Sequence, residues 1–126
     1  MKITIIDHFV LTVRSIPDTC AFYERVLGMK AAKFGGRRWA LLFGHQKINL
    51  HQVGKEFEPN AKSPVAGAGD FCLISGEPLS EVVRQLNEAG IPIEMGPVSK
   101  SGAKGPIMSV YIRDPDENLV EISEYE

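Results

Sequence analysis

The chain has 126 residues, of which 44% are hydrophobic, and a formal net charge of −2. This composition suffices for one domain with a packed core and excludes a disordered chain. No long basic run occurs, which argues against nucleic acid as a partner. Asp7 and His8 interrupt the apolar start of the chain too early for a signal peptide or a membrane span. We therefore expect a cytoplasmic protein without a membrane partner.

The first half of the chain is predicted to form one strand, one helix and three further strands. The opening strand is expected over residues 4–13, with His8 and Phe9 on opposite faces because side chains alternate along a strand. Ser15 is suited to begin a helix, whose apolar stripe ends at Gly28, a residue typical of helix ends. Three strands then follow, separated by turns that contain glycine, at residues 29–34, 38–43 and 47–53.

A segment rich in proline, glycine and polar residues, 54–69, is predicted to link this half to a second one. The second half repeats the same order of elements. A strand is expected over 70–74, followed by a helix that starts near Pro78. The remaining expected elements are a strand at 93–98, a polar loop at 99–105, a strand at 107–113, a turn at 114–118 and a last strand at 119–123.

The two halves share one sequence offset. His8 and Asp70 are 62 residues apart (70 − 8), and so are Gly28 and Gly90 (90 − 28). A common offset for a strand and a helix end indicates a duplicated module. We therefore expect an α+β fold in which paired βαβββ modules form a curved mixed sheet around a cavity, with helices outside. The chain would be a single domain, with a first module over about 1–53, a linker over 54–69 and a second module over 70–126.

The two cysteines, Cys20 and Cys72, both lie in segments with an apolar pattern. Free cysteine behaves as a small hydrophobic residue, and disulfides are rare in reducing compartments. Both cysteines are therefore predicted to be reduced core residues.

Polar side chains interrupt four of the expected strands, and they are candidates for a binding site. Glu121 stands between two apolar residues of the last strand, and a carboxylate there is costly unless it is paired or bound to a metal. Imidazole and carboxylate donors together suit Fe, Mn, Ni or Zn. Structural roles are the alternatives: a hydrogen-bonded strand histidine, a turn cap or a residue on a solvated face. The candidates are His8, Asn49 or His51, Asp70 and Glu121.

Three motifs resemble the vicinal oxygen chelate superfamily, which includes glyoxalase I, extradiol dioxygenases, and fosfomycin- and bleomycin-resistance proteins. The motifs are Asp7-His8-Phe9-Val10-Leu11-Thr12-Val13, Phe22-Tyr23-Glu24-Arg25-Val26-Leu27-Gly28-Met29 and the segment from Tyr111 to Glu121, Tyr-Ile-Arg-Asp-Pro-Asp-Glu-Asn-Leu-Val-Glu. The resemblance covers nearly the whole chain. It implies a divalent metal (Ni, Zn, Fe, Mn or Co), a small-molecule substrate and a homodimer.

The same resemblance implies metal ligands on the first, fourth, fifth and last strands. His8 matches the first ligand and Glu121 the last. Asp70 stands where the family usually has a histidine. On the fourth strand, Asn49 occupies the position of the family's glutamate, whereas His51 is the better ligand by its chemistry. The expected set is His8, His51, Asp70 and Glu121, with Asn49 open as the alternative to His51.

The resemblance leaves several activities open. Ring-cleaving dioxygenases carry a tyrosine ten residues before the last glutamate, as Tyr111 is, but Lys104 stands where they have a proton-shuttling histidine. Fosfomycin-resistance proteins carry hydroxyl groups at the positions of Ser109 and Tyr111, so these residues and Lys104 are candidate substrate contacts.

Glyoxalase chemistry needs a metal that polarises a carbonyl and a carboxylate that moves a proton, a role suited to Glu121. We therefore expect a metal-dependent, glyoxalase-like lyase or isomerase that acts on a small α-oxo or vicinal-oxygen substrate, such as the methylglyoxal–glutathione adduct. A protein of the bleomycin-resistance type that sequesters a ligand without catalysis is the alternative.

Overall fold

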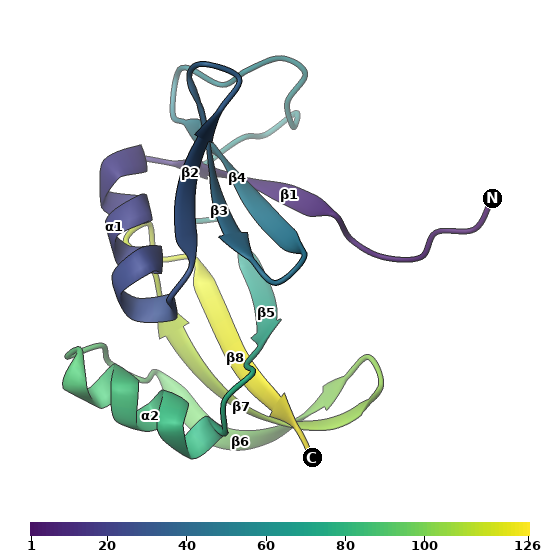
Figure 1. Ribbon diagram of the computed structural model, residues 1–126, viewed down its shortest axis with the longest axis vertical. Coiled ribbons are helices and arrows are strands. Elements are labelled where there is room, and N and C mark those ends of the chain that lie inside the picture. Colours follow the sequence, from purple (N-terminus) through teal and green to yellow (C-terminus); the bar gives the residue numbers. More distant parts are fainter. The chain divides into compact units, whose positions relative to one another are not determined.

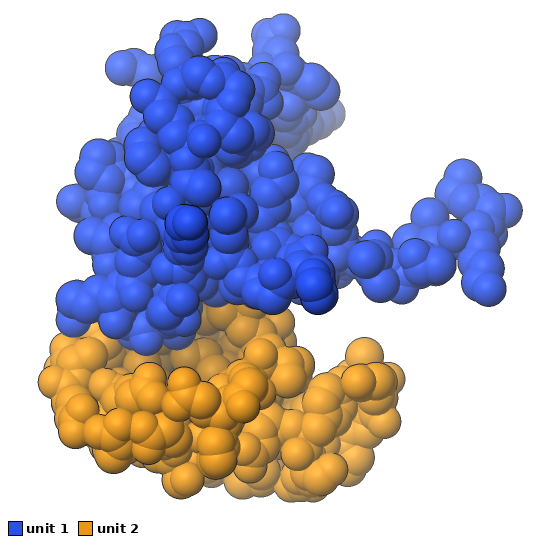
Figure 2. All heavy atoms as spheres, viewed as in Figure 1, with its two compact units in different colours: residues 1–67 blue, residues 68–126 orange.

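The computed structural model describes all 126 residues, and the chain divides into two compact units (Figures 1 and 2). Unit 1 comprises Met1–Gly67 and unit 2 comprises Ala68–Glu126. Each unit contains one helix and one four-stranded sheet of mixed strand direction. The order βαβββ therefore occurs twice, which confirms the predicted α+β class with paired βαβββ modules.

The elements of unit 1 are β1 (His8–Val13), α1 (Ile16–Leu27), β2 (Lys30–Phe34), β3 (Arg38–Phe43) and β4 (Gln46–Gln52). Those of unit 2 are β5 (Asp70–Ile74), α2 (Leu79–Glu88), β6 (Met95–Gly102), β7 (Gly105–Arg113) and β8 (Leu119–Tyr125). Both sheets have the same topology, β1-β4-β3-β2 in unit 1 and β5-β8-β7-β6 in unit 2. In each, the first and last strands of the module are parallel and the other pairs are antiparallel.

The strand registers make the duplication explicit. Val10 lies opposite Asn49 in unit 1, and Cys72 lies opposite Glu121 in unit 2. Val10 and Cys72 keep the offset of 62 residues seen in the sequence. Asn49 and Glu121 are therefore equivalent positions of the two modules.

Helix α1 begins and ends as its sequence predicts. The Ser15 side chain accepts a hydrogen bond from the Asp18 N–H, and Gly28 ends the helix in the left-handed conformation. The helix packs on β2, β3 and β4 through a buried face that includes Tyr23, which is fully buried. The sheet covers this face with the inward side chains of alternate residues, among them Leu41 and Ile48.

Unit 2 has a smaller helix and a separate set of core residues. Helix α2 packs on β7 and buries Leu79 and Leu86. Val120 and Ile122 of β8 are buried, so Glu121 between them points to the opposite face of the sheet. The alternation predicted from the sequence is thus what directs this carboxylate away from the helix.

Two local expectations differ from the structure. Strand β1 starts at His8, because residues 1–7 have almost no ladder partner, and Ile3, Ile5 and Ile6 are exposed. Strand β6 runs through most of the segment predicted as a polar loop, pairing with β7 as far as Gly102 opposite Gly105. Its polar residues face a cavity and solvent, so their polarity was not a sign of a loop. None of the helices has the length and apolar character that crossing a membrane requires.

Candidate active site

The carboxylate of Glu121 is the centre of a hydrogen-bonded cluster on the sheet of unit 2. Its Oε2 atom accepts hydrogen bonds from Ser109 Oγ at 2.6 Å and from Ser123 Oγ at 3.3 Å. The two serine oxygens are themselves 2.6 Å apart, and both serines are fully buried. Because each hydroxyl has one proton and Ser109 donates its proton to Glu121, Ser123 donates either to Glu121 or to Ser109. These hydrogen bonds fix the orientation of the carboxylate.

Glu121 also faces two side chains on neighbouring strands. Cys72 lies opposite it on β5 and Tyr111 lies opposite it on β7. Burial and the negative charge of Glu121 raise the pKa of the Tyr111 phenol, so Tyr111 is protonated and can donate a hydrogen bond. Burial likewise raises the pKa of the Cys72 thiol, and the Glu121 charge acts in the same direction. These neighbours are neutral groups in contact with a carboxylate.

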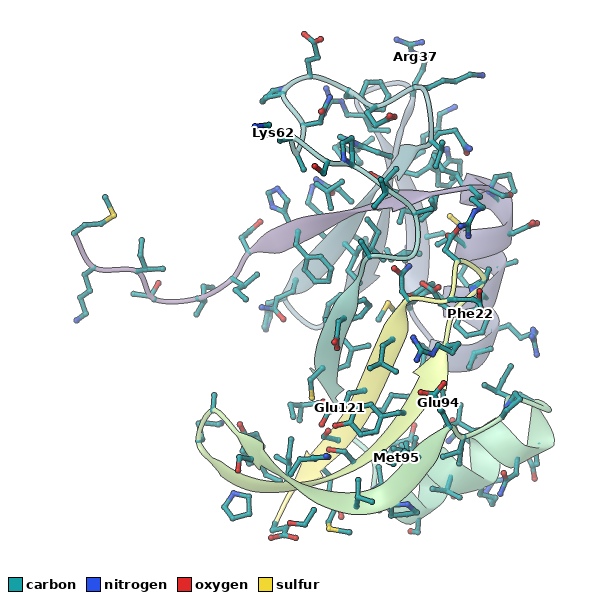
Figure 3. The ribbon with its side chains drawn as sticks, turned by 180° about the vertical axis from the view of Figure 1, so that it is seen from behind. Phe22, Arg37, Lys62, Glu94, Met95 and Glu121 are labelled. Atoms are coloured by element: carbon teal, nitrogen blue, oxygen red, sulfur yellow. The ribbon has the colours of Figure 1, made fainter.

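These side chains line a cavity of about 430 Å³ on unit 2. Glu121 of β8 is labelled in Figure 3. Two charged residues line the cavity, Glu121 and Lys100, and two tyrosines, Tyr111 and Tyr125, add hydroxyl groups. The other lining residues are Cys72, Ile74, Ser101, Gly102, Ala103 and Ile107. An acid, a base and hydroxyl donors around a small volume are features of a site for a polar small molecule.

The three candidate substrate contacts have different surroundings. Tyr111 lines the cavity, whereas the hydroxyl of the buried Ser109 is directed at Glu121. The ammonium of Lys104 lies over the ring of Tyr125, 5.0 Å from its centroid, and the Lys104 side chain does not line the cavity. Sequence reasoning missed Lys100, whose place on the same face follows only once β6 is known to continue through residues 99–102.

The cysteine prediction is half right. Both cysteines are free, and Cys20 is buried as expected. Cys72 is exposed and lines the cavity, so its prediction as a core residue is wrong. The apolar pattern of β5 misled because both faces of this edge strand carry apolar or sulfur-containing residues.

In unit 1, His8 begins β1 with its ring held by a neighbour. Asp7 Oδ2 lies 2.7 Å from His8 Nδ1, which leaves Nε2 as the nitrogen for another partner. A carboxylate that orients an imidazole in this way is common around metal-bound histidines. His8 therefore has the local setting of a ligand.

Asn49 and His51 lie on the same face of the sheet as His8, at different distances from it. His8 is opposite Lys47, so Asn49 is two residues and His51 four residues farther along β4. At about 3.3 Å per residue and about 4.8 Å between strands, the backbones are roughly 8 Å apart for Asn49 and roughly 14 Å for His51. Asn49 is thus the closer donor to His8.

The surroundings of the two side chains also differ. Asn49 Oδ1 is buried and has no hydrogen-bond partner, which makes it an available oxygen donor. His51 is buried, and its ring packs edge-on against Phe57 at 5.6 Å. Burial, together with the charge of Arg38, lowers the pKa of His51. Its imidazole is therefore neutral, as a ligand must be, but it is engaged in packing.

Asp70 and Glu121 have the same relative positions on their adjacent strands as His8 and Asn49 have in unit 1. Asp70 begins β5 opposite Leu119, two residues before Glu121 on the adjacent strand. Each unit thus carries one diagonal pair of donors, His8 with Asn49 and Asp70 with Glu121. Within neither unit do three or more His, Cys, Asp or Glu side chains gather at one point.

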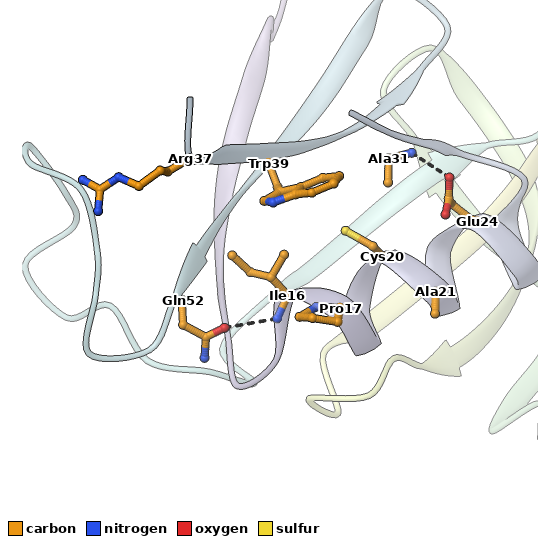
Figure 4. A pocket seen from close by; sticks show the side chains of 9 residues that line it. All are labelled: Ile16, Pro17, Cys20, Ala21, Glu24, Ala31, Arg37, Trp39 and Gln52. Atoms are coloured by element: carbon orange, nitrogen blue, oxygen red, sulfur yellow. Dashed lines mark hydrogen bonds between the residues drawn. The ribbon is translucent and has the colours of Figure 1, made fainter. Parts of the chain in front are cut away.

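A second cavity, of about 670 Å³, lies in unit 1 between α1 and the strands that it covers (Figure 4). The half-buried Trp39 lines it from β3, and Cys20 lines it from α1. Two of its polar side chains already form hydrogen bonds. Gln52 accepts from the Ile16 N–H and donates to the Arg14 carbonyl, and Glu24 accepts from the Ala31 N–H. Trp39 therefore packs on the helix side of the sheet, the face opposite to His8 and Asn49.

The profile of the Glyoxalase/Bleomycin resistance protein/Dioxygenase superfamily matches residues 5–122. The chain belongs to this superfamily. The match confirms the resemblance drawn from the sequence motifs. It agrees with the duplicated βαβββ order and with strand positions of His8 and Glu121 near the start and end of the matched range.

Two proteins known by sequence are similar to this superfamily member along its length. Virulence protein STM3117 of Salmonella typhimurium is 55% identical over 99% of this chain and 87% of its own. The glyoxalase domain-containing protein RDO1 of Mycosarcoma maydis is 47% identical over all of this chain and 71% of its own.

Solved structures show the same relationship. The crystal structure of the Salmonella virulence protein superposes over the full length of both chains with a TM-score of 0.99. A lactoylglutathione lyase from Agrobacterium tumefaciens is 25% identical, with a TM-score of 0.75 over 98% of this chain and 96% of its own. The fold is thus shared with proteins whose names range from virulence to lyase activity.

Proposed function

We propose that the protein is a metal-dependent lyase or isomerase of the glyoxalase type that acts on a small α-oxo or vicinal-oxygen substrate. The observation that carries the proposal is the carboxylate of Glu121, which is oriented by Ser109 and Ser123 at the wall of a cavity. A general base must be held in hydrogen-bonding reach of the proton that it removes. Glu121 has this preparation, and no other carboxylate lines the cavity.

The proposed metal ligands are His8 and Glu121, completed by Asp70 and by Asn49 or His51. The residues fit a divalent ion in kind: Asn49 Oδ1 is a buried oxygen without a partner, and the Asp7 carboxylate orients the His8 ring. The closer spacing to His8 favours Asn49 over His51. One nitrogen and several oxygen donors favour Mn or Fe among the candidate ions. When bound, the ion supplies Lewis-acid polarisation of a substrate carbonyl.

The roles of the chain's own residues follow from their contacts. Glu121 would take the proton from the hydroxyl-bearing carbon beside the substrate carbonyl and return it to the former carbonyl carbon, while the hydroxyl proton passes to the former carbonyl oxygen. Ser109 and Ser123 hold the carboxylate at Oε2 and so fix its direction. Tyr111, whose pKa is raised by burial and by the charge of Glu121, is protonated and donates a hydrogen bond to a substrate oxygen. Ser109 is in this account a positioning residue, while Tyr111 remains a substrate contact.

The methylglyoxal–glutathione adduct is the first substrate to test. The likeness to a lactoylglutathione lyase at 25% identity supports this choice. The assay compares the unchanged protein with Glu121→Gln, which keeps the size and one oxygen of the side chain but removes the base. We expect the variant to lose at least about a hundredfold in turnover, as is usual when a general base is removed.

Glu124→Gln is the matched control for this assay. Glu124 lies on the same strand, and its Oε2 accepts a hydrogen bond from the Leu79 N–H at the start of α2, away from the cavity. Its glutamine variant retains an acceptor oxygen and should keep full turnover. Element analysis of the purified protein should find about one divalent ion per chain. Equal turnover of Glu121→Gln and the unchanged protein would refute the proposal.

A non-catalytic, ligand-sequestering protein is the second candidate. The amide of Asn49 favours it, because an amide oxygen is a weaker metal ligand than the carboxylate that the family pattern has at this position. This reading predicts ligand binding that is unaffected by a chelator and no turnover. The lyase reading predicts that the chelator removes the metal and abolishes turnover at the same time.

We also propose that the protein is a homodimer, as members of the superfamily often are. The N-terminal segment supports this, since Ile3, Ile5 and Ile6 are 80%, 72% and 66% exposed and have apolar side chains without a covering surface in their own unit. Light scattering on the purified protein checks the proposal. A mass of a single chain would contradict it.

A further inference from the structure

We propose that the cavity of unit 2 selects substrates that carry a carboxylate group, and that the ammonium of Lys100 binds this group beside the phenol of Tyr111. The inference rests on the proposed function in taking this cavity as the substrate site. It adds the charge of the substrate and the residue that binds the charged group. The candidate on the sequence alone was Lys104, whose ammonium lies over Tyr125 instead.

The position of Lys100 follows from the register of β6. Lys100 lies opposite Ile107 on β7, and Ile107 lies opposite Tyr125 on β8. These residues share the sheet face of Glu121 but sit four residues away from it along the strands, roughly 13 Å at the backbone. Lysine and glutamate thus stand at the two ends of one cavity.

The Lys100 side chain spans part of this distance. Its Nζ lies 5.8 Å from the centroid of the Tyr111 ring, and Tyr111 is directly opposite Glu121. Lys100 forms no ion pair with a carboxylate, so its charge faces the aromatic ring and the cavity. A ligand between Lys100 and Glu121 would therefore meet a cation at one end, a carboxylate base at the other, and the Tyr111 side chain between them.

Charge balance favours a carboxylate over a phosphate or phosphonate dianion. The lining of the cavity has one ammonium, Lys100, and one carboxylate, Glu121. The charge of a divalent ion held by Glu121 and Asp70 would be offset by these two carboxylates, which leaves Lys100 as the one uncompensated charge. A single lysine neutralises one negative charge, so a dianion would leave a second charge unpaired near Glu121, and an unpaired charge in a partly buried site is costly. The volume of about 430 Å³ lies toward the small end of ligand cavities. These features together fit a small 2-oxo acid.

Binding of two matched probes tests the inference. Pyruvate is a 2-oxo carboxylate, and methyl pyruvate is the same skeleton with the charge removed. NMR titration of the purified full chain measures the affinity for each, and methylphosphonate tests the dianion alternative. Lys100→Met removes the ammonium while keeping an unbranched chain. Lys33→Met makes the same change on β2 of unit 1, outside the cavity.

We expect pyruvate to bind more tightly than methyl pyruvate and methylphosphonate. Lys100→Met should weaken pyruvate binding by about tenfold or more, since hydrogen bonds to charged groups are the strong ones. The same variant should leave methyl pyruvate binding unchanged, and Lys33→Met should change neither. The inference is overturned if pyruvate binds no better than its ester, if both lysine variants weaken it equally, or if methylphosphonate binds most tightly.

The outcome is independent of the proposed reaction. Glu121→Gln should abolish turnover but keep the preference for pyruvate over its ester, because Lys100 is unchanged. A charge preference without turnover would therefore refute the lyase proposal and leave the role of Lys100 standing. Turnover of the glutathione adduct without any charge preference would do the opposite.

Discussion

Asn49 and Glu121 occupy equivalent positions in the two units but have opposite surroundings. Glu121 is opposite Tyr111 and accepts hydrogen bonds from two buried serines. Asn49 is opposite Ala40, and its Oδ1 atom is buried without a partner. The duplicated backbone thus carries a charged, fully supported group in unit 2 and a neutral, unsupported one in unit 1.

The difference shows that a partly buried carboxylate needs hydrogen-bond donors around it. A partly buried charge is tolerated when hydroxyl groups donate to it, and the serines and tyrosine of β7 and β8 supply them. An uncharged amide in the same place costs less to leave unpaired, so Ala40 is tolerated beside it. Under the proposed function, unit 2 would supply the base for proton transfer, and unit 1 would offer an oxygen and an imidazole as donors.

The largest expected effect concerns the backbone that supports the serine cluster. Strand β6 has an irregular register between Met95 and Val98, and a Cβ atom on Gly96 would lie 2.3 Å from the Ser109 carbonyl oxygen. Gly96→Ala should lower the free energy of unfolding by about 3 kcal/mol, from overpacking and from the strain of a positive φ. Chemical denaturation measures this loss.

Gly36→Ala in unit 1 is the matched control for that measurement. Gly36 also has a positive φ, but a Cβ there would meet nothing within 4 Å. Only backbone strain applies, so we expect a loss of about 1 kcal/mol. Equal losses for the two variants would mean that the close approach of β6 to β7 does not matter for stability.

A smaller effect is expected when Asn49 is replaced by glutamate, the residue type at the equivalent position 121. Asn49→Glu restores a carboxylate at this position, and as a metal ligand it should tighten Mn²⁺ binding by about tenfold, or about 1.4 kcal/mol. Calorimetric titration of the chain with Mn²⁺ measures the change. Asn87→Glu on α2 adds the same charge elsewhere and should leave the affinity unaltered. No gain with Asn49→Glu would exclude position 49 from the ligand set.

The smallest expected effect is on the pH dependence of stability. It concerns His51 and its equivalent Ser123, which lie two residues beyond Asn49 and Glu121 on β4 and β8. His51 of β4 lies opposite Thr12, and the equivalent Ser123 of β8 lies opposite Ile74. Burial and Arg38 lower the pKa of His51 in the folded chain, whereas the unfolded chain binds a proton near pH 6.5. The stability that depends on neutral His51 is therefore complete above about pH 6.5 and declines as the pH falls below it.

Melting temperatures between pH 7.5 and pH 5, conditions chosen to bracket about pH 6.5, check this expectation. His51→Gln should flatten the decline, and His45→Gln, at an exposed turn, should not. A parallel decline in all three proteins would show that another group is responsible.

The sequence predicted the fold through features that depend on local rules. The shared offset of 62 residues, the Ser15 cap and Gly28 located both modules and the first helix. Alternation around Glu121 placed its carboxylate on the face away from the core. The helix ends and the alternation depend only on neighbours in the chain, and the offset depends only on comparing the chain with itself. This is why they could be predicted.

The parts of the site that the sequence did not reveal depend on pairing between strands. Lys100 was overlooked because a polar, glycine-bearing segment resembles a loop until its ladder with β7 is known. The register also distinguishes Asn49 from His51 by their distance along β4 from His8. Cys72 was assigned to the core because its exposure depends on the edge position of β5.

We propose that His8 and Glu121 are ligands of one metal ion, and the proposed function depends on this claim. A double-mutant cycle on Mn²⁺ affinity, with His8→Ala, Glu121→Gln and the combination, tests it most directly. If both side chains ligate the same ion, either single change should remove most of the affinity and the second should add little, a coupling that independent sites do not show. Losses that simply add, or a metal affinity unaffected by either change, would contradict the account.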